Sequence, residues 1–151
     1  MLNKTTRTVL VAMLCLLGSA CASTTSMPLN APNANETTVY LIRQHAEPSA
    51  WNLNVSIDGT KVASVANRSY VAFSAPAGTH ALALTWPLLA GGADVSGNVT
   101  LAPGQAQYFV MSGRVAVGGH TADGTIVNSS LQVREIAPVA GKALIESLAA
   151  K

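Results

Sequence analysis

The sequence predicts a mainly β fold, an antiparallel β-sandwich of about eight strands with a short C-terminal helix. Three observations lead to this expectation. From residue 38 onward, short apolar segments alternate as strands do, turns rich in Gly and Pro separate them, and the last segment changes to a helical period. Of the 151 residues, 49% are hydrophobic and only 11% are charged, so the chain can bury the core of one domain.

Residues 1–20 have the layout of an export signal. Two cations, Lys4 and Arg7, precede an uninterrupted apolar run at residues 9–17. As a helix this run would reach about 14 Å, half of a hydrocarbon core, which suits a signal and is too short for a membrane span. Small residues from Gly18 onward lead into Cys21. This order resembles the lipobox of bacterial lipoproteins, although Gly18 stands where that motif normally has leucine, and it implies that Cys21 is lipidated.

An ordinary secretory signal, cleaved after Ala20 or Ala22, is the alternative. Counting cysteines favours lipidation, because Cys15 would leave with the signal and Cys21 would have no disulfide partner in the chain. Acyl chains on Cys21 would anchor the protein to a membrane. Because Ala22 rather than an aspartate follows the cysteine, the resemblance implies an outer-membrane lipoprotein facing the periplasm.

Composition divides the remaining chain in two. Residues 21–37 are small, polar and interrupted by prolines, which predicts a lipid-anchored flexible tether. Residues 38–151 are expected to form the β-sandwich domain. Strands are expected at residues 39–42, 51–58, 61–65, 69–75, 80–86, 95–101, 106–112 and 125–136.

Turn and helix signals complete the expected fold. Asp58 and Gly59 predict a tight hairpin turn with positive φ. The segment from Gly113 to Gly124 is rich in glycine and is expected to be a mobile loop. A helix of about twelve residues is expected from Pro138, and it should pack on the sheet because a helix of that length is marginal alone. Its expected apolar stripe consists of Ala140, Leu144, Ile145 and Leu148.

Four segments of this chain carry a recurring strand-and-turn pattern: Val39–Arg43, Val55–Val62, Ser69–His80 and Leu101–Val110. In this order they resemble the bacterial lipoproteins that contain domain of unknown function 2846. That family combines a first strand, an Asp-Gly turn, an aromatic strand, a Pro-x-Gly-x-His turn and a short final helix. The resemblance covers about residues 38–151 and implies a fold and a membrane address but no activity. PEGA-like β-sandwich modules share the two turns and are the close rival.

Charge and motifs exclude several classes of function. The chain has nine Lys and Arg, of which Lys4 and Arg7 lie in the signal, and the remaining seven balance its seven Asp and Glu. Nucleic-acid binders need a basic surface, so no nucleic acid is expected as a partner. The sequence contains no Gly-x-Ser-x-Gly motif, no phosphate loop and no close pair of carboxylates. We therefore expect no enzyme, no catalytic residues and no cofactor.

The histidines are the next candidates for a site. His45 and Glu47 could share one face of an extended segment, but a zinc site needs three or four ligands and no third is apparent, so no metal is expected. His80 follows a Pro-Ala-Gly-Thr turn and is expected to stabilise that turn by a hydrogen bond. His120 lies in the glycine-rich segment, where an exposed side chain is the default expectation.

Two tryptophans remain. Trp86 is in phase with apolar neighbours on its strand, so core packing is favoured over a sugar-binding platform. Trp51 begins a strand and could either pack in the core or form a ligand-binding platform. The sequence thus leaves two functions open, a non-enzymatic structural or protein-interaction domain contacting envelope proteins, and a domain that binds a small glycan or peptide. For the second, the candidate ligand-binding residues are Trp51, His45 and His120.

Overall fold

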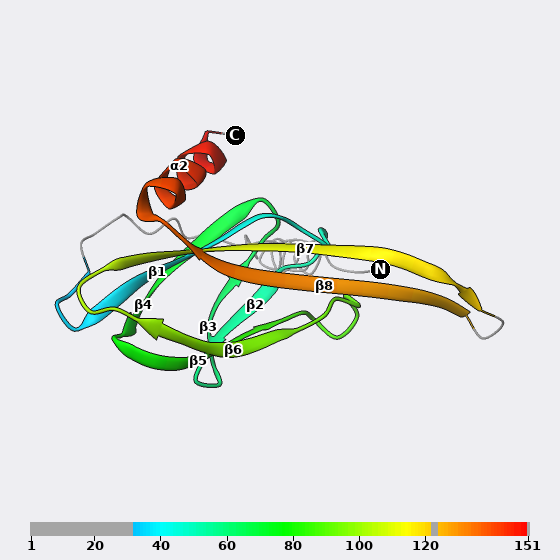
Figure 1. Ribbon diagram of the computed structural model, residues 1–151, viewed down its shortest axis with the longest axis horizontal. Helices are drawn as coiled ribbons and strands as arrows, with labels where there is room; N and C mark the ends of the chain where they lie inside the picture. The colour runs from blue at the N-terminus through cyan, green and yellow to red at the C-terminus, as the bar shows by residue number, and fades with distance from the viewer. Residues whose placement is uncertain (1–31, 122–123, 151) are drawn as a thin grey trace, which may run out of the picture.

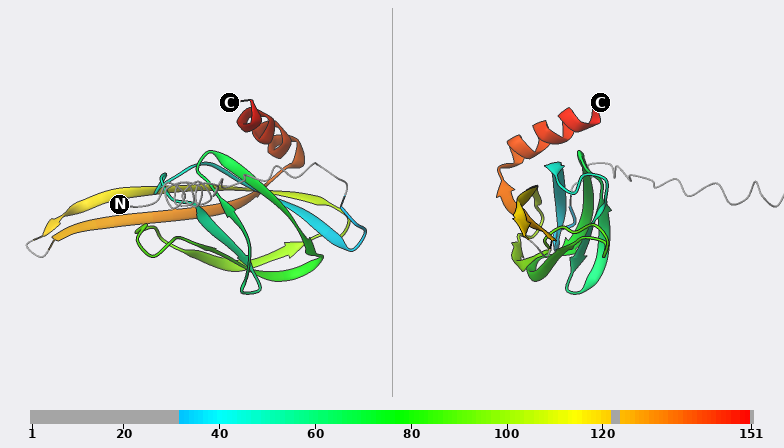
Figure 2. Two further views of the ribbon diagram at one scale, coloured as in Figure 1. Left: turned by 180° about the vertical axis from the view of Figure 1, so that it is seen from behind. Right: turned by 90° about the vertical axis from the view of Figure 1, so that its right-hand side faces the viewer.

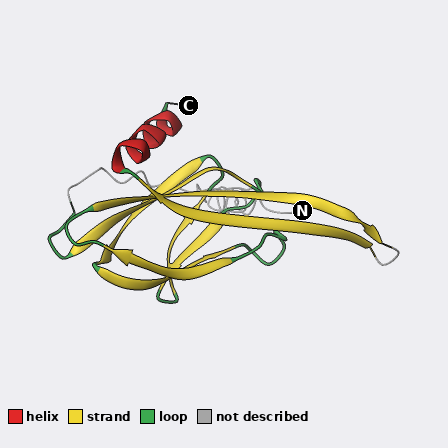
Figure 3. Ribbon diagram, viewed as in Figure 1, coloured by secondary structure: helices red, strands yellow, loops and turns green. Residues whose placement is uncertain are grey.

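The structure, a computed structural model, describes residues 32–121 and 124–150 (Figure 1). It confirms the mainly β fold, since eight strands form two four-stranded sheets and one helix follows the last strand (Figure 3). The elements in chain order are β1 (Glu36–Ala46), β2 (Leu53–Ile57), β3 (Thr60–Val65), β4 (Ser69–Pro76), β5 (Gly78–Thr85), β6 (Val95–Leu101), β7 (Ala106–Thr121), β8 (Gly124–Ile136) and α2 (Pro138–Ala149).

The first sheet has the strand order β4-β1-β7-β8, and the second has the order β3-β2-β5-β6. All neighbouring strands are antiparallel except β1 and β7, which run parallel. This one parallel pair departs from the expected antiparallel sandwich. It arises because the chain builds β4 and the whole second sheet before it returns beside β1. The central place of β1 agrees with its apolar residues 39–42, all of which are buried.

The core lies between the inner faces of the two sheets. Alternate residues of each strand point into it, as strand geometry requires. Its buried residues include Val39, Leu41, Leu53, Val55, Phe73, Leu84, Phe109, Met111 and Leu131.

A second apolar cluster lies on the outer face of the first sheet, beneath α2 (Figure 2). Tyr40 and Tyr108 face each other in the parallel register and stack with ring centroids 4.8 Å apart. The helix buries Ile145 and Gly141 against this cluster, with Leu144 and Leu148 half-buried at its side. Ala140 is exposed, so its expected place on the apolar stripe was wrong, because the contact face is turned towards Gly141 instead.

The expected mobile loop from Gly113 to Gly124 was also wrong. The strands β7 and β8 stay paired through Thr121 and Gly124, and this long ribbon runs past the end of the sandwich (Figure 1). Its glycines serve the pairing. A side chain at Gly113 would meet the backbone oxygen of Ser130, and Gly118 has no partner across the register shift between residues 117 and 119.

Two other boundaries can be compared with expectation. β1 begins at Glu36, two residues before the expected start of the domain, and Thr37 is buried with its hydroxyl donating to the carbonyl of Ala102 at 2.6 Å. Asp58 and Gly59 have φ values of 49° and 78°, which confirms the tight turn between β2 and β3. Within the described residues, no helix is long and apolar enough to cross a membrane.

Candidate functional site

Several connections meet at the end of the sandwich from which the β7–β8 ribbon leaves. They are the segment 47–52 between β1 and β2, the turn 66–68 between β3 and β4, and the loop 86–94 between β5 and β6. We call this the ribbon end of the molecule. It holds the features that could carry a function, and one buried cation organises it.

The cation is Arg43, whose side chain is completely buried. Its Nη1 donates to the carbonyl of Trp51 at 2.7 Å and to that of Val65 at 3.2 Å. Its Nη2 donates to the carbonyls of Ala46 at 2.6 Å and of Pro48 at 2.9 Å. One guanidinium group therefore ties the end of β1, the segment that follows it and the end of β3 into one unit.

No carboxylate accompanies this guanidinium among the described residues, and its Nε has no hydrogen-bond partner there. The face of the Trp86 ring lies 4.8 Å from the guanidinium carbon, which places a cation–π contact on one side of the group. Burial lowers the pKa of Arg43 from its ordinary value, because the charged form loses its water. Carbonyl dipoles and the indole face take the place of that water.

Glu47 marks where the pairing of β1 with β7 ends. Its backbone N–H donates to the carbonyl of Gly113 at 3.3 Å, as the next residue of a parallel strand would. The N–H of Val115, two residues further along β7, donates instead to the Glu47 side chain, at 3.0 Å from Oε2. The Glu47 carboxylate thus accepts the hydrogen bond that a backbone carbonyl of β1 would accept if the strand continued. Beyond Val115 the β7–β8 ribbon continues without β1.

A groove of about 690 Å³ opens beside this point, on the part of the outer sheet face that α2 leaves uncovered. His45 and Glu47 form one wall, and the facing residues come from β7 and β8. Ser112 pairs with Gln132 across these strands, and Arg114 pairs with Ser130. The lining is mostly exposed and mixes polar side chains with Val115 and Ala116, so the outer face of the first sheet has an apolar half under the helix and a mixed half that is open.

The two candidate ligand-binding residues whose side chains the structure describes, His45 and Trp51, do not come together. His45 lines the groove, with its Nδ1 3.4 Å from the amide nitrogen of Asn67. Trp51 is 41% exposed and lies outside the groove lining. The backbone of His120 belongs to β7, but its side chain lies outside the described residues. Trp86 is buried in the core cluster, so core packing is confirmed for it.

Arg43 was missed by the sequence analysis. The available signal was a cation that directly follows four apolar residues in a chain with few charges. Such a residue would be expected at the exposed end of a strand. Only the fold shows that the segment 47–52, the end of β3 and the ring of Trp86 enclose it.

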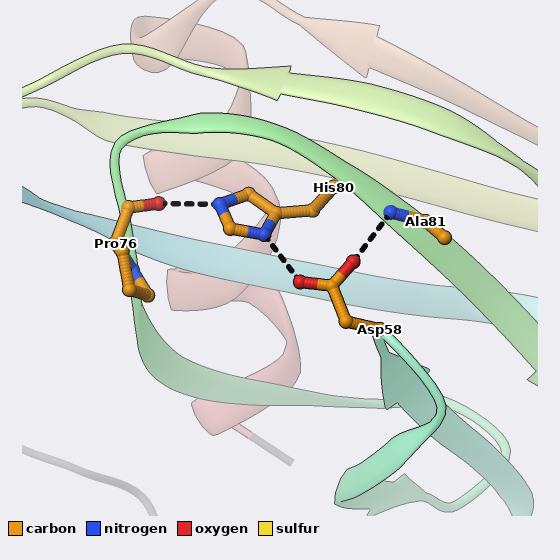
Figure 4. A network of polar contacts seen from close by, with 4 residues as sticks. All are labelled: Asp58, Pro76, His80 and Ala81. Atoms are coloured by element: carbon orange, nitrogen blue, oxygen red, sulfur yellow. Dashed lines mark hydrogen bonds and ion pairs between the residues drawn. The ribbon is translucent and has the colours of Figure 1, made fainter.

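At the opposite end of the sandwich, His80 forms the turn-stabilising contact expected for it, together with Asp58 (Figure 4). Its Nε2 lies 2.9 Å from the carbonyl of Pro76, and its Nδ1 lies 2.7 Å from Oδ2 of Asp58. Asp58 Oδ1 also accepts the N–H of Ala81 at 2.9 Å. A carbonyl and a carboxylate only accept hydrogen bonds, so both contacts require the imidazolium form. The pair joins the β2–β3 turn to the β4–β5 turn.

This pair predicts a pH dependence of stability. The hydrogen bond with Asp58 raises the pKa of His80, and the bond from His80, followed by that from Ala81, lowers the pKa of Asp58. The contribution of His80 is therefore complete below its ordinary pKa of 6.5 and is lost as the pH rises through the raised value. That of Asp58 is present above its ordinary value of 3.8 and is lost as the pH falls through the lowered one.

We expect His80→Gln to lower the urea midpoint most between about pH 4 and pH 6.5, and progressively less as the pH rises above that window. Urea titrations of both proteins across this range measure the difference. His45→Gln is the control, because the one polar side-chain contact of His45 with the described residues is with the Asn67 amide and involves no carboxylate. A deficit for His80→Gln that grows towards alkaline pH would contradict the ion pair.

Among the described residues, no group of three or more His, Cys, Asp or Glu side chains is placed to hold a metal ion. One oxygen of Glu47 already accepts the N–H of Val115, so this carboxylate has a structural role and is not simply a metal ligand beside His45. A comparison of the chain with models of known protein families found no match, and a search of curated proteins found none either. The resemblance to the lipoprotein family therefore stays a prediction, and the function has to be inferred from the geometry.

Proposed function

We propose that this protein is a non-enzymatic, lipid-anchored domain of the bacterial cell envelope that binds a partner protein by strand addition at β8. The observation that carries the proposal is the edge that β8 presents. It is a strand of 13 residues whose only partner strand among the described residues is β7. From Gly124 to Val133 it contains no charged residue.

Edge strands of soluble proteins are usually short, charged or covered, because an unpaired row of N–H and C=O groups recruits other strands. The other edges of this molecule fit that rule better. β3 has six residues, with Lys61 among them and a register shift against β2, and β4 lies next to α2. β8 is nearly twice as long as β6, the remaining edge, which has seven residues. It is therefore the edge best suited to pair with another chain.

The projecting part of the ribbon supports the same proposal. We call residues 116–121 and 124–129 the arm. Within the described structure, the arm consists of two paired strands with no third strand, because β1 stops pairing at Gly113. A two-stranded ribbon by itself is only marginally stable in water. A strand added along β8 would supply the missing neighbour and would bind chiefly through main-chain hydrogen bonds.

Membrane attachment is the other part of the proposal. The apolar run, the small residues before Cys21 and the absence of a second mature cysteine support it. The resemblance to domain of unknown function 2846 points to the same address. Such an anchor would keep the domain near envelope proteins, which compensates for the modest affinity of a single added strand.

A second candidate function is the binding of a small polar ligand, such as a peptide or glycan, in the groove. The observation in its favour is the cavity of about 690 Å³ with His45 in its wall. None of the described residues that line it is a Trp, Tyr or Phe, which weakens the case for a glycan. The first candidate function binds its partner along the backbone of β8, and the second binds its ligand in the groove. One experiment can therefore separate them.

The experiment uses two directly paired and exposed positions, Gln132 on the edge strand and Ser112 on the neighbouring inner strand. Both line the groove, but only Gln132 belongs to the edge. A photo-reactive side chain at Gln132 should crosslink a defined envelope protein in intact cells, and the same group at Ser112 should give little product. Hydrogen exchange of the purified complex should then show new protection of backbone amides in residues 129–136. Equal crosslinking from both positions, with protection confined to residues 45–47 and 112–115, would instead support the groove ligand.

A further inference from the structure

The loop between β5 and β6 presents two adjacent leucines to solvent. Leu88 is 98% exposed and Leu89 is 84% exposed. A single exposed leucine is ordinary on a protein surface, but two neighbours at such exposure are costly in water and call for a partner. The segment from Pro87 to Ala93 carries no charge, and its other residues are Ala and Gly.

The loop is held in shape rather than left loose. The N–H of Ala90 donates to the carbonyl of Pro87 at 2.9 Å, which closes a turn with the two leucines at its tip. The base of the loop is Trp86, whose Nε1 donates to the carbonyl of Ala93 at 3.1 Å and whose N–H donates to Asp94 Oδ1 at 2.8 Å. A side chain at Gly92 would overlap the indole ring, so the loop packs closely over it.

Arg43 connects this loop to the second exposed apolar group of the ribbon end. Its guanidinium contacts the ring of Trp86 and donates a hydrogen bond to the backbone carbonyl of Trp51. Trp51 is 41% exposed. An aliphatic pair at a loop tip and an exposed tryptophan at the same end of a domain are a composition found where proteins enter the interface of a bilayer.

We propose that the loop 87–93 inserts Leu88 and Leu89 into the lipid bilayer to which Cys21 is anchored. The inference rests on the proposed anchor for its geometry. Residues 33–35 are held beside the start of β1, since the Asn33 carbonyl accepts the N–H of Glu36 and the Asn35 carbonyl accepts that of Ala77. Pro32, the first described residue, comes eleven residues after Cys21, a length of chain that can extend about 38 Å. The 11 residues of β1 span about 36 Å. The segment is therefore long enough for the ribbon end, where β1 finishes, to reach the same membrane surface.

Insertion would define how the domain sits on the membrane. An acyl anchor on a long segment fixes the distance of the domain from the bilayer only loosely, and a second contact at the leucines would fix its orientation as well. The loop and the arm lie at the same end of the sandwich (Figure 1). The added strand would then meet β8 close to the membrane surface.

The first test follows the environment of the loop in the mature acylated protein, reconstituted in vesicles of phosphatidylethanolamine and phosphatidylglycerol. A polarity-sensitive fluorophore is attached at Leu89→Cys or at Val139→Cys. Val139 is the matched control, because it is 83% exposed but lies at the start of α2, away from the ribbon end. We expect blue-shifted emission and quenching by brominated lipid at position 89 only. Emission typical of water at both positions would overturn the proposal, as would a blue shift at 89 that needs an added envelope protein.

The second test separates the loop from the anchor. In a Cys21→Ala background, replacing both leucines by serine should weaken binding to the same vesicles about tenfold, while Val139→Ser leaves it unchanged. Equal binding of all three proteins would overturn insertion. Palmitate labelling of the wild-type chain reports on the anchor independently. Loss of labelling in Cys21→Ala supports the anchor, and an unlabelled wild-type chain refutes the anchor while the vesicle assay still decides for the leucines.

Discussion

Replacing Arg43 by methionine is expected to lower the free energy of unfolding by about 4 kcal/mol. Methionine keeps an unbranched apolar stem but is shorter and donates no hydrogen bonds, so four carbonyls that now accept from the guanidinium would be left without that donor. Exchanging a buried ion pair for apolar residues can be neutral, because both charged partners are removed together. Here the partners belong to the backbone and cannot be removed.

Urea denaturation measures this effect as a fall of the midpoint at an unchanged slope. Arg114→Met is the matched control, since Arg114 is exposed and should change stability by less than about 0.5 kcal/mol. Hydrogen exchange adds a local readout, because amides in the segment 47–52 should lose protection first. A variant as stable as the wild type would show that Arg43 does not organise the ribbon end.

The second large effect is expected from Gly141→Ala, with a loss of about 2 kcal/mol. Alanine favours a helix over glycine by about 1 kcal/mol, so helix propensity alone predicts a gain. A Cβ at this position would overlap the ring of Tyr108, which is itself buried and stacked on Tyr40. The ring cannot move aside, and α2 would have to lift from the sheet.

Gly97→Ala is the control for this substitution, because nothing lies within 4 Å of the added atom there. It should leave stability within about 0.5 kcal/mol of the wild type. Urea titration of the two variants side by side gives the comparison. If Gly141→Ala raised the stability, helix propensity would outweigh the contact, and the close approach of α2 to β7 would be refuted.

Much of the fold could be predicted from local patterns. The alternation at residues 53–57 and the Asp58-Gly59 turn are properties of a few neighbouring residues, and both lie where expected. The Pro138 start of the helix is of the same kind. The length of β7 and β8 could not be predicted in this way. Glycine is common in loops, and only the pairing partner reveals that Gly113 is needed because the Ser130 carbonyl lies so close.

The candidate site was less predictable, because its parts come from distant segments. The groove brings His45 and Glu47 beside residues more than sixty positions later in the chain, and no local pattern contains that distance. The exposure of Leu88 and Leu89 could not be predicted either, because apolar residues that follow a strand are expected to be buried and only the fold shows these two at the surface. The turn-stabilising role of His80 was predictable because the turn and the histidine are adjacent.

The position of β1 has a consequence for a domain held by its N-terminal end. A pull on residue 36 acts along the axis of β1, which has β4 on one side and β7 on the other. Such a load acts on both ladders in shear, so their hydrogen bonds must break together rather than one after another as when an edge strand is peeled away. Tension applied through the proposed N-terminal anchor would thus be resisted by both ladders at once, because the strand that takes the load is the one with neighbours on both sides.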